Sequence, residues 1–176
     1  MKRISVYRKL MVLAGCVSFV CAANVGVSFA ASQATSLGGQ VVTPIAISKT
    51  QDLQFGKFIA GTGGSLTIAP ADALGHVPAV TGAVVTNATF AAAASPASFT
   101  VTGESGAAYS ITLPSSATLT HGADTMTVDS FLSDAGGSPV ITGGSVVVNV
   151  GAKVTVASGQ NPGVYAGSFN VSVDYP

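Results

Sequence analysis

The feature that most constrains the fold is a two-residue alternation of apolar and polar side chains, which recurs from residue 31 onward. It is clearest at Leu66 and Ile68, at Phe99 and Val101, at Tyr109, Ile111 and Leu113, at Met126 and Val128, and at Val146, Val148 and Val150. Because successive side chains of a β-strand point to opposite faces, this spacing predicts half-buried strands. Glycine-rich turns, such as residues 61–64 and 159–163, separate the segments. The pattern therefore predicts an all-β antiparallel sandwich.

Helical patterns are scarce in this part of the chain. Residues 88–97 include four consecutive alanines, but Pro96 follows before three helical turns can form. We expect a loop there with at most one helical turn.

The last segment carries the longest alternation. Every second residue is apolar or glycine: Tyr165, Gly167, Phe169, Val171, Val173 and Tyr175. This predicts one long strand with one face in the core, since a one-residue slip would turn Phe169 into water. The sequence ends one residue later, at Pro176, so we expect no following strand to pair with it. Two forms remain open: a complete sandwich, and one that lacks its last strand.

The first 30 residues have the pattern of an export signal. Four basic residues precede an uncharged run over residues 10–30: Lys2, Arg3, Arg8 and Lys9. The run ends in Ser-Phe-Ala, so we expect cleavage between Ala30 and Ala31. An uncleaved anchor and a lipoprotein whose lipobox is Leu13–Cys16 are weaker alternatives. The expected protein is exported to the periplasm and then to the cell surface or the medium, with no membrane span after cleavage.

Removal of residues 1–30 would leave a flexible arm over residues 31–40 and a β-sandwich domain over residues 41–176. This remainder has no cysteine, and its three lysines and seven acidic residues give a net charge of −4. A surface so poor in cations has little with which to neutralise phosphates. We therefore expect no nucleic-acid partner.

The residues that usually carry catalysis or metal binding are sparse and scattered. The two histidines, His76 and His121, lie 45 positions apart beside glycines. Asp124, Asp129 and Asp134 recur every five residues, whereas a calcium loop needs ligands at every second position. We expect no catalytic, cofactor-binding or metal site, and hence a protein that is not an enzyme.

Several short landmarks resemble a family of exported bacterial domains, domain of unknown function 4402. They are Pro44–Ile47, Asp52–Gly56, Phe99–Gly103, Tyr109–Pro114 and Pro162–Gly167. That family is similar in layout to the spore-coat-protein-U type of archaic pilins. Gly163 and Tyr175 also match the glycine fourteenth from the end and the penultimate tyrosine of chaperone-usher pilus subunits.

The resemblance implies an incomplete immunoglobulin-like sandwich, whose missing strand comes from the amino-terminal arm of the next subunit. The residues implied on the acceptor side are Gly163, Tyr165, Phe169, Val171, Val173 and Tyr175. The arm offers Ala34 and Leu37 as donor residues, because the family comparison places residues 41–47 in the domain's own first strand. The implied partners are further copies, joined head to tail, or a periplasmic chaperone and usher.

Two functions remain open on this basis. The first is a structural subunit of a pilus or surface fibre, assembled by β-strand complementation. The second is a monomeric secreted or surface-associated binding or adhesion module, whose sandwich is completed by its own chain.

Overall fold

The computed structural model describes residues 31–87 and 89–176. The expected export signal over residues 1–30, including Ala30 of the cleavage site, lies outside the described residues. The chain divides into two units, Met1–Gly39 and Gln40–Pro176. In the first unit, residues 31–39 have no regular secondary structure and are exposed.

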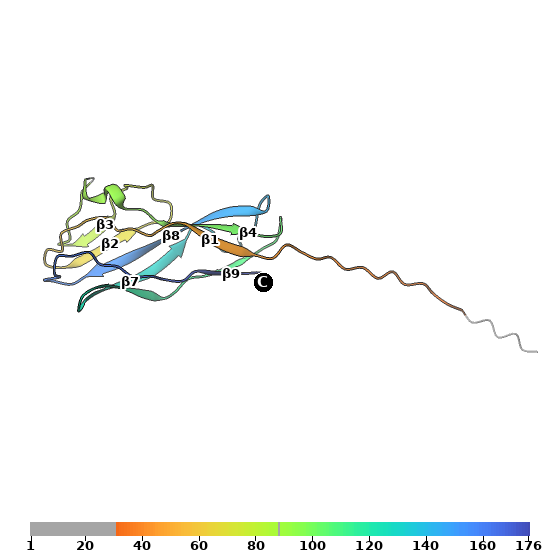
Figure 1. The fold of residues 1–176 in the computed structure, drawn as a ribbon. Helices are drawn as coiled ribbons and strands as arrows, with labels where there is room; N and C mark the ends of the chain where they lie inside the picture. Colours follow the sequence, from red (N-terminus) through yellow and green to blue (C-terminus); the bar gives the residue numbers. More distant parts are fainter. Residues whose placement is uncertain (1–30, 88) are drawn as a thin grey trace, which may run out of the picture. The chain divides into compact units, whose positions relative to one another are not determined.

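In the second unit, the regular secondary structure of the described residues consists of β-strands and one short 3₁₀-helix (Figure 1). Its elements are β1 (Ala46–Gln51), β2 (Gly64–Ile68), β3 (Ala79–Gly82), η1 (Phe90–Ala93), β4 (Ala97–Thr102), β5 (Ser110–Thr112), β6 (Ser116–His121), β7 (Asp124–Ser133), β8 (Ser145–Val156) and β9 (Ser172–Asp174). Every strand pair is antiparallel. The predicted all-β sandwich is thereby confirmed, and η1 agrees with the expectation of at most one helical turn within residues 88–97.

The twelve-residue strand β8 organises the main sheet. Val150 of β8 pairs with Ala97 of β4 and with Ser133 of β7, so β4 and β7 lie on opposite edges of β8. Val154 pairs with both β2 and β7, so β2 follows β4 along the same edge. Outside these strands lie β1 next to β4, β3 next to β2 and β6 next to β7.

The core follows the predicted alternation. The larger apolar cluster includes Leu66, Phe99, Met126, Val128 and Val154. A smaller cluster is formed by Val101, Tyr109, Ile141, Val148 and Val173. Branched and aromatic residues at every second position supply these inward faces, as expected for half-buried strands.

The prediction of one long carboxyl-terminal strand is wrong, because most of this segment forms no strand hydrogen bonds. Only β9 pairs, with β5, and Ala166 forms an isolated bridge with Thr120 of β6. Between these two contacts the terminal segment advances six residues, from 166 to 172, while its partner advances eight, from 112 to 120. The two extra residues break the register, and Pro114, within this stretch of the partner, has no N–H to donate.

The predicted faces of this segment are nevertheless confirmed. Phe169 and Val171 are half-buried and Val173 is buried, while the residues between them are exposed. The alternation of buried and exposed side chains is therefore present even where the backbone forms no ladder. The first strand also differs from the implied one: β1 begins at Ala46, and residues 41–45 lie outside any strand.

Leu66 tests the central packing, because it is fully buried while its cross-strand partner Val80 is 44% exposed. We expect Leu66→Ala to lower the free energy of unfolding by about 2 to 5 kcal/mol, through lost burial and the cavity left behind. Val80→Ala, the matched control, should change it by less than about 0.5 kcal/mol. Urea unfolding of the purified chain measures both. Equal losses would contradict the difference in burial between Leu66 and Val80.

Candidate functional site

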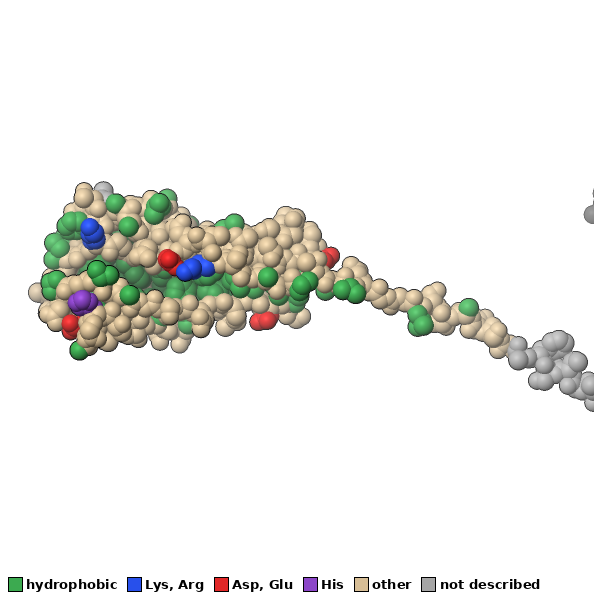
Figure 2. Space-filling model, viewed as in Figure 1, with side chains coloured by type: hydrophobic (Ala, Val, Ile, Leu, Met, Phe, Trp, Pro, Cys, Tyr) green, Lys and Arg blue, Asp and Glu red, His purple; other side chains and the backbone are tan. Residues whose placement is uncertain are grey.

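A long apolar groove runs along the domain and has a volume of about 1140 Å³. One wall is formed by residues 52–61, which follow β1, and the other by residues 160–169, which precede β9. Figure 2 shows the green apolar side chains that line this hollow between its two walls. The groove therefore lies between two segments that contain no regular strand.

The floor of the groove consists of apolar side chains from three strands: Ala97 and Phe99 of β4, Ala117 and Leu119 of β6, and Met126, Val128 and Phe131 of β7. The charged lining residues are Asp52 and Lys57 of the first wall and Lys49 of β1, and Lys49 forms an exposed ion pair with Asp52 at 2.5 Å. An occupant without charge would suit this lining, because burying an unpaired charge is costly.

The first wall has one bonded and one unbonded backbone edge. Gln54 exchanges two backbone hydrogen bonds with Ser95, at 2.9 and 2.8 Å, and Ile59 exchanges two with Val85, at 2.8 and 2.9 Å. Phe55 and Phe58 make no backbone–backbone hydrogen bond with any described residue. Lys57 also donates to the Phe90 carbonyl at 2.8 Å, and Gly56, with a φ of 73°, interrupts the strict alternation between Gln54 and Ile59. The backbone groups of Phe55 and Phe58, which lie between these bonded residues, therefore remain open to pairing.

The second wall is arranged in the same way. Ala166 exchanges two hydrogen bonds with Thr120 of β6, at 2.9 and 3.1 Å, so the backbone of Tyr165 and Gly167 faces the other side. Phe169 holds this wall against the floor, since its ring centroid lies 4.8 Å from that of Phe131 and 6.5 Å from that of Phe99. These aromatic contacts fix the wall without a continuous ladder.

At one end of the groove, position 163 has no room for a side chain, so glycine is required there. A side chain there would collide with the ring of His121, which lies against Tyr165 with a centroid separation of 5.3 Å. The Tyr165 hydroxyl donates to the Asn161 carbonyl and accepts from Gln160, both at 2.8 Å. These contacts order the start of the second wall.

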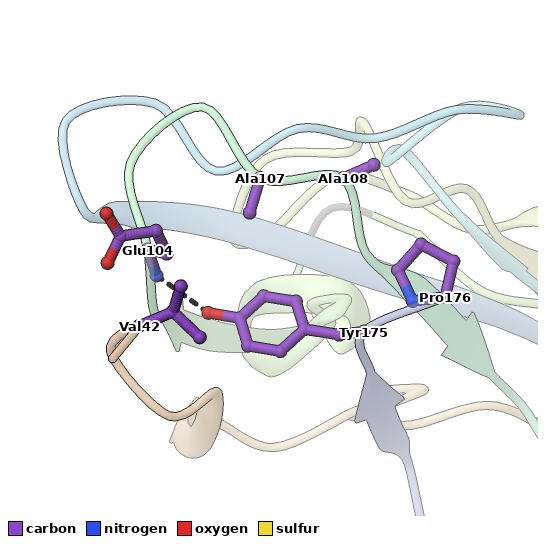
Figure 3. Close-up of a pocket in the computed structure, with 6 residues that line it drawn as sticks. All are labelled: Val42, Glu104, Ala107, Ala108, Tyr175 and Pro176. Atoms are coloured by element: carbon purple, nitrogen blue, oxygen red, sulfur yellow. Dashed lines mark hydrogen bonds between the residues drawn. The ribbon is translucent and has the colours of Figure 1, made fainter. Parts of the chain in front are cut away.

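Tyr175 forms a separate polar contact at the entrance of the chain into the domain. Its hydroxyl donates to the Thr43 carbonyl at 2.8 Å and accepts from the Glu104 N–H at 2.7 Å. The Glu104 carboxylate accepts from the Thr43 N–H at 3.0 Å. A small cavity of about 350 Å³ lies beside this contact, lined by Val42, Glu104, Ala107, Ala108, Tyr175 and Pro176 (Figure 3). We call Tyr175, Glu104 and Thr43 the latch.

The latch also lowers the pKa of one of its own residues. The pKa of the Glu104 carboxyl lies below its ordinary value, mainly because the backbone N–H of Thr43 donates to it and secondarily because of the Thr43 side chain. The latch is therefore strongest when Glu104 is ionised.

The structure divides the residues implied for the acceptor side into two groups. Gly163, Tyr165 and Phe169 line the groove. Val171 packs against the larger core cluster, whereas Val173 and Tyr175 belong to the smaller one, away from the groove. The implied donor residues Ala34 and Leu37 lie in the exposed segment over residues 31–39.

Two parts of the groove were missed by sequence reasoning. One is the wall over residues 52–61, of which the sequence offers only the family landmark Asp52–Gly56. The other is Phe131, which a strict alternation from Val128 places outside. A bulge between Asp129 and Leu132, with Ser130 at a φ of 57°, shifts the register and turns Phe131 inward. In the sequence, only the aromatic character of Phe131 indicates that it is buried.

Over residues 31–87 and 89–176, no three His, Cys, Asp or Glu residues lie close enough to share a metal ion. Within these ranges there is also no helix with the length and hydropathy to cross a membrane.

Fold and site define an all-β sandwich domain with an apolar groove between two open backbone edges. The chain belongs to the family described as domain of unknown function (DUF4402), whose model matches residues 45–175. The match includes both groove walls, the floor and Tyr175. No curated protein and no solved structure gives a significant match.

Tyr175→Phe tests the latch, because it removes the hydroxyl and keeps the ring. We expect a loss of about 1 to 3 kcal/mol in the free energy of unfolding, since two hydrogen bonds disappear. Tyr109→Phe is the matched control, because Tyr109 belongs to the same smaller core cluster and takes no part in the hydrogen bonds of the latch. Urea unfolding should separate the two variants, and equal effects would show that the ring alone matters.

Glu104→Gln tests the titration of the latch. A carboxyl whose folded pKa is lowered adds stability above its unfolded pKa of about 4.3, and that stability is lost as the pH falls through the folded value. The wild-type urea midpoint should therefore fall more steeply than that of Glu104→Gln below about pH 4.3. Asp129, whose pKa is lowered first by Ser130 and then by Lys153, acts with the same sign in both proteins. Parallel curves would contradict the prediction.

Proposed function

We propose that the protein is a non-enzymatic structural subunit of an extracytoplasmic fibre or pilus, exported by the signal over residues 1–30 and joined to its neighbours by strand complementation. The observation that carries this proposal is the apolar groove between two walls with open backbone edges. An extended peptide in such a groove gains main-chain hydrogen bonds on both sides, and its alternate side chains fill the apolar floor.

The proposed occupant is the amino-terminal segment of a second copy. Residues 31–42 contain no charged side chain and are exposed throughout, so their burial carries no desolvation of a charge. The twelve residues are also long enough to follow walls of about ten residues each. Donor and acceptor are different surfaces, so repeated contacts generate a head-to-tail filament.

An apolar groove in transit is an aggregation hazard, because open strand edges and apolar patches recruit other chains. The proposal therefore includes temporary cover by a periplasmic chaperone before an usher or the next subunit supplies the final strand. The fibre would lie on the cell surface or in the medium.

Two complementary variants test the assembly. Deletion of residues 31–40 leaves a subunit that can only accept, and Ala117→Trp fills the groove floor and leaves one that can only donate. We expect each alone to give monomers, and co-expression to give dimers but no longer ladders, because neither variant can both donate and accept. Protein sheared from cells and electrophoresed with and without boiling measures this.

Ala157→Trp is the matched control, because Ala157 is exposed and lies outside the groove lining. It should form wild-type ladders. A wild-type protein that runs as one monomeric species without boiling would overturn the fibre proposal and favour the monomeric binding module. Ladders from the deletion variant alone would show that the donor lies elsewhere.

A further inference from the structure

We infer that the donor presents its odd-numbered face, Leu37, Gly39 and Val41, to the groove of a second copy, and that the latch at Thr43 marks where the donated stretch ends. This inference rests on the proposed function and adds to it the donor face and the donor boundary.

The donor face follows from the geometry of an extended strand. Ala34 and Leu37 are three residues apart, so their side chains point to opposite faces and cannot both enter one groove. The face that carries Ala34 continues with Ser36, Gly38, Gln40 and Val42, and Val42 already lines the small cavity beside the latch. The face that carries Leu37 continues with Gly39 and Val41, and it therefore holds the two large apolar residues that remain free to enter another groove.

Exposure points to the same face. Leu37 is 97% exposed and Val41 is 99% exposed, although burial of each such side chain is worth about 1.5 to 3 kcal/mol. Neither residue belongs to a strand. Two fully exposed apolar side chains in an uncharged segment match the chemistry of the uncharged groove floor.

The donor boundary follows from the latch. Thr43 has its N–H bonded to Glu104 and its C=O bonded to Tyr175. A residue whose two backbone groups are held by its own domain has neither available for a ladder with another chain. Val42 already lines the small cavity beside the latch (Figure 3). Tyr175 is thus a positioning residue that separates the donated from the retained chain.

Four full-length variants test the donor face. Leu37→Asp and Val41→Asp place a charge on the inferred inward face, and Ala34→Asp and Gln40→Asp, the matched controls, place it on the outward face. We expect the first pair to lower the amount of boiling-sensitive ladder at least tenfold, and the second pair to leave it within about twofold, because only an inward charge loses its water. Trypsin resistance checks that each domain remains folded.

The outcomes separate the inference from the proposed function. Equal losses from both pairs, or a larger loss from Ala34→Asp and Gln40→Asp, would overturn the face assignment while the fibre proposal stands. If wild-type ladders are absent and the accept-only and donate-only variants form no dimers, the proposed function fails and takes the inference with it.

Photo-crosslinking tests the donor boundary by a readout that stability alone does not move. A photoreactive amino acid at position 37 or 41 should link to residues 52–61 or 160–169 of an isotopically distinct second copy, as identified by mass spectrometry. The same group at position 45 should give no link between copies. Such a link from position 45 would overturn the boundary at Thr43.

Discussion

The structure depends on the pairing of β8 along both of its edges. β4 and β2 follow each other on one edge and β7 occupies the other, so the register of this strand places every other strand of the main sheet. Its inward residues Val148, Val150 and Val154 are fully buried. Gly151 lies where the backbone of Ile68 and Ala69 crosses β8, and a side chain there would collide with both residues. The hydrophobic core and the central ladder therefore specify one another.

Because β8 is hydrogen-bonded along both edges, the backbone edges that remain unpaired lie in the two groove walls. The walls over residues 52–61 and 160–169 bond outward, through Gln54, Ile59 and Ala166, and leave their inner edges facing the groove. Natural sheets usually protect such edges with charges, prolines or short strands. Here Asp52, Lys57 and Pro162 lie on the walls, but the floor between the two open edges carries apolar side chains, which is the chemistry of an interface. The combination of open edges and an apolar floor is the physical basis of the proposed strand complementation.

Sequence reasoning succeeded where local pattern and burial coincide. The alternation at Leu66 and Ile68, and at Val148 and Val150, identified strands and their inward faces. An apolar residue at every second position indicates a strand with one buried face. The terminal segment shows the limit: the half-burial of Phe169 was predictable, but the broken ladder depends on a two-residue mismatch with β5 and β6 that no local pattern contains. The bulge at Ser130 similarly redirected Phe131. The Tyr175 hydroxyl reaches Thr43 across 132 positions, so only the folded chain reveals the latch.

One stretch of chain joins the two roles that the proposed fibre requires. Residues 160–169 form a groove wall, β9 pairs with β5, and Tyr175 then holds Thr43 at the root of the arm. The acceptor edge and the anchor of the donor are therefore connected by covalent bonds over a few residues, with the unpaired residues 167–171 between them. In the proposed fibre, a strand that pairs with the edge at Tyr165 and Gly167 would order this connecting stretch. Each accepted strand would then stiffen the segment that anchors the subunit's own donor arm. The carboxyl-terminal stretch would therefore serve both the addition of a subunit and the positioning of the arm.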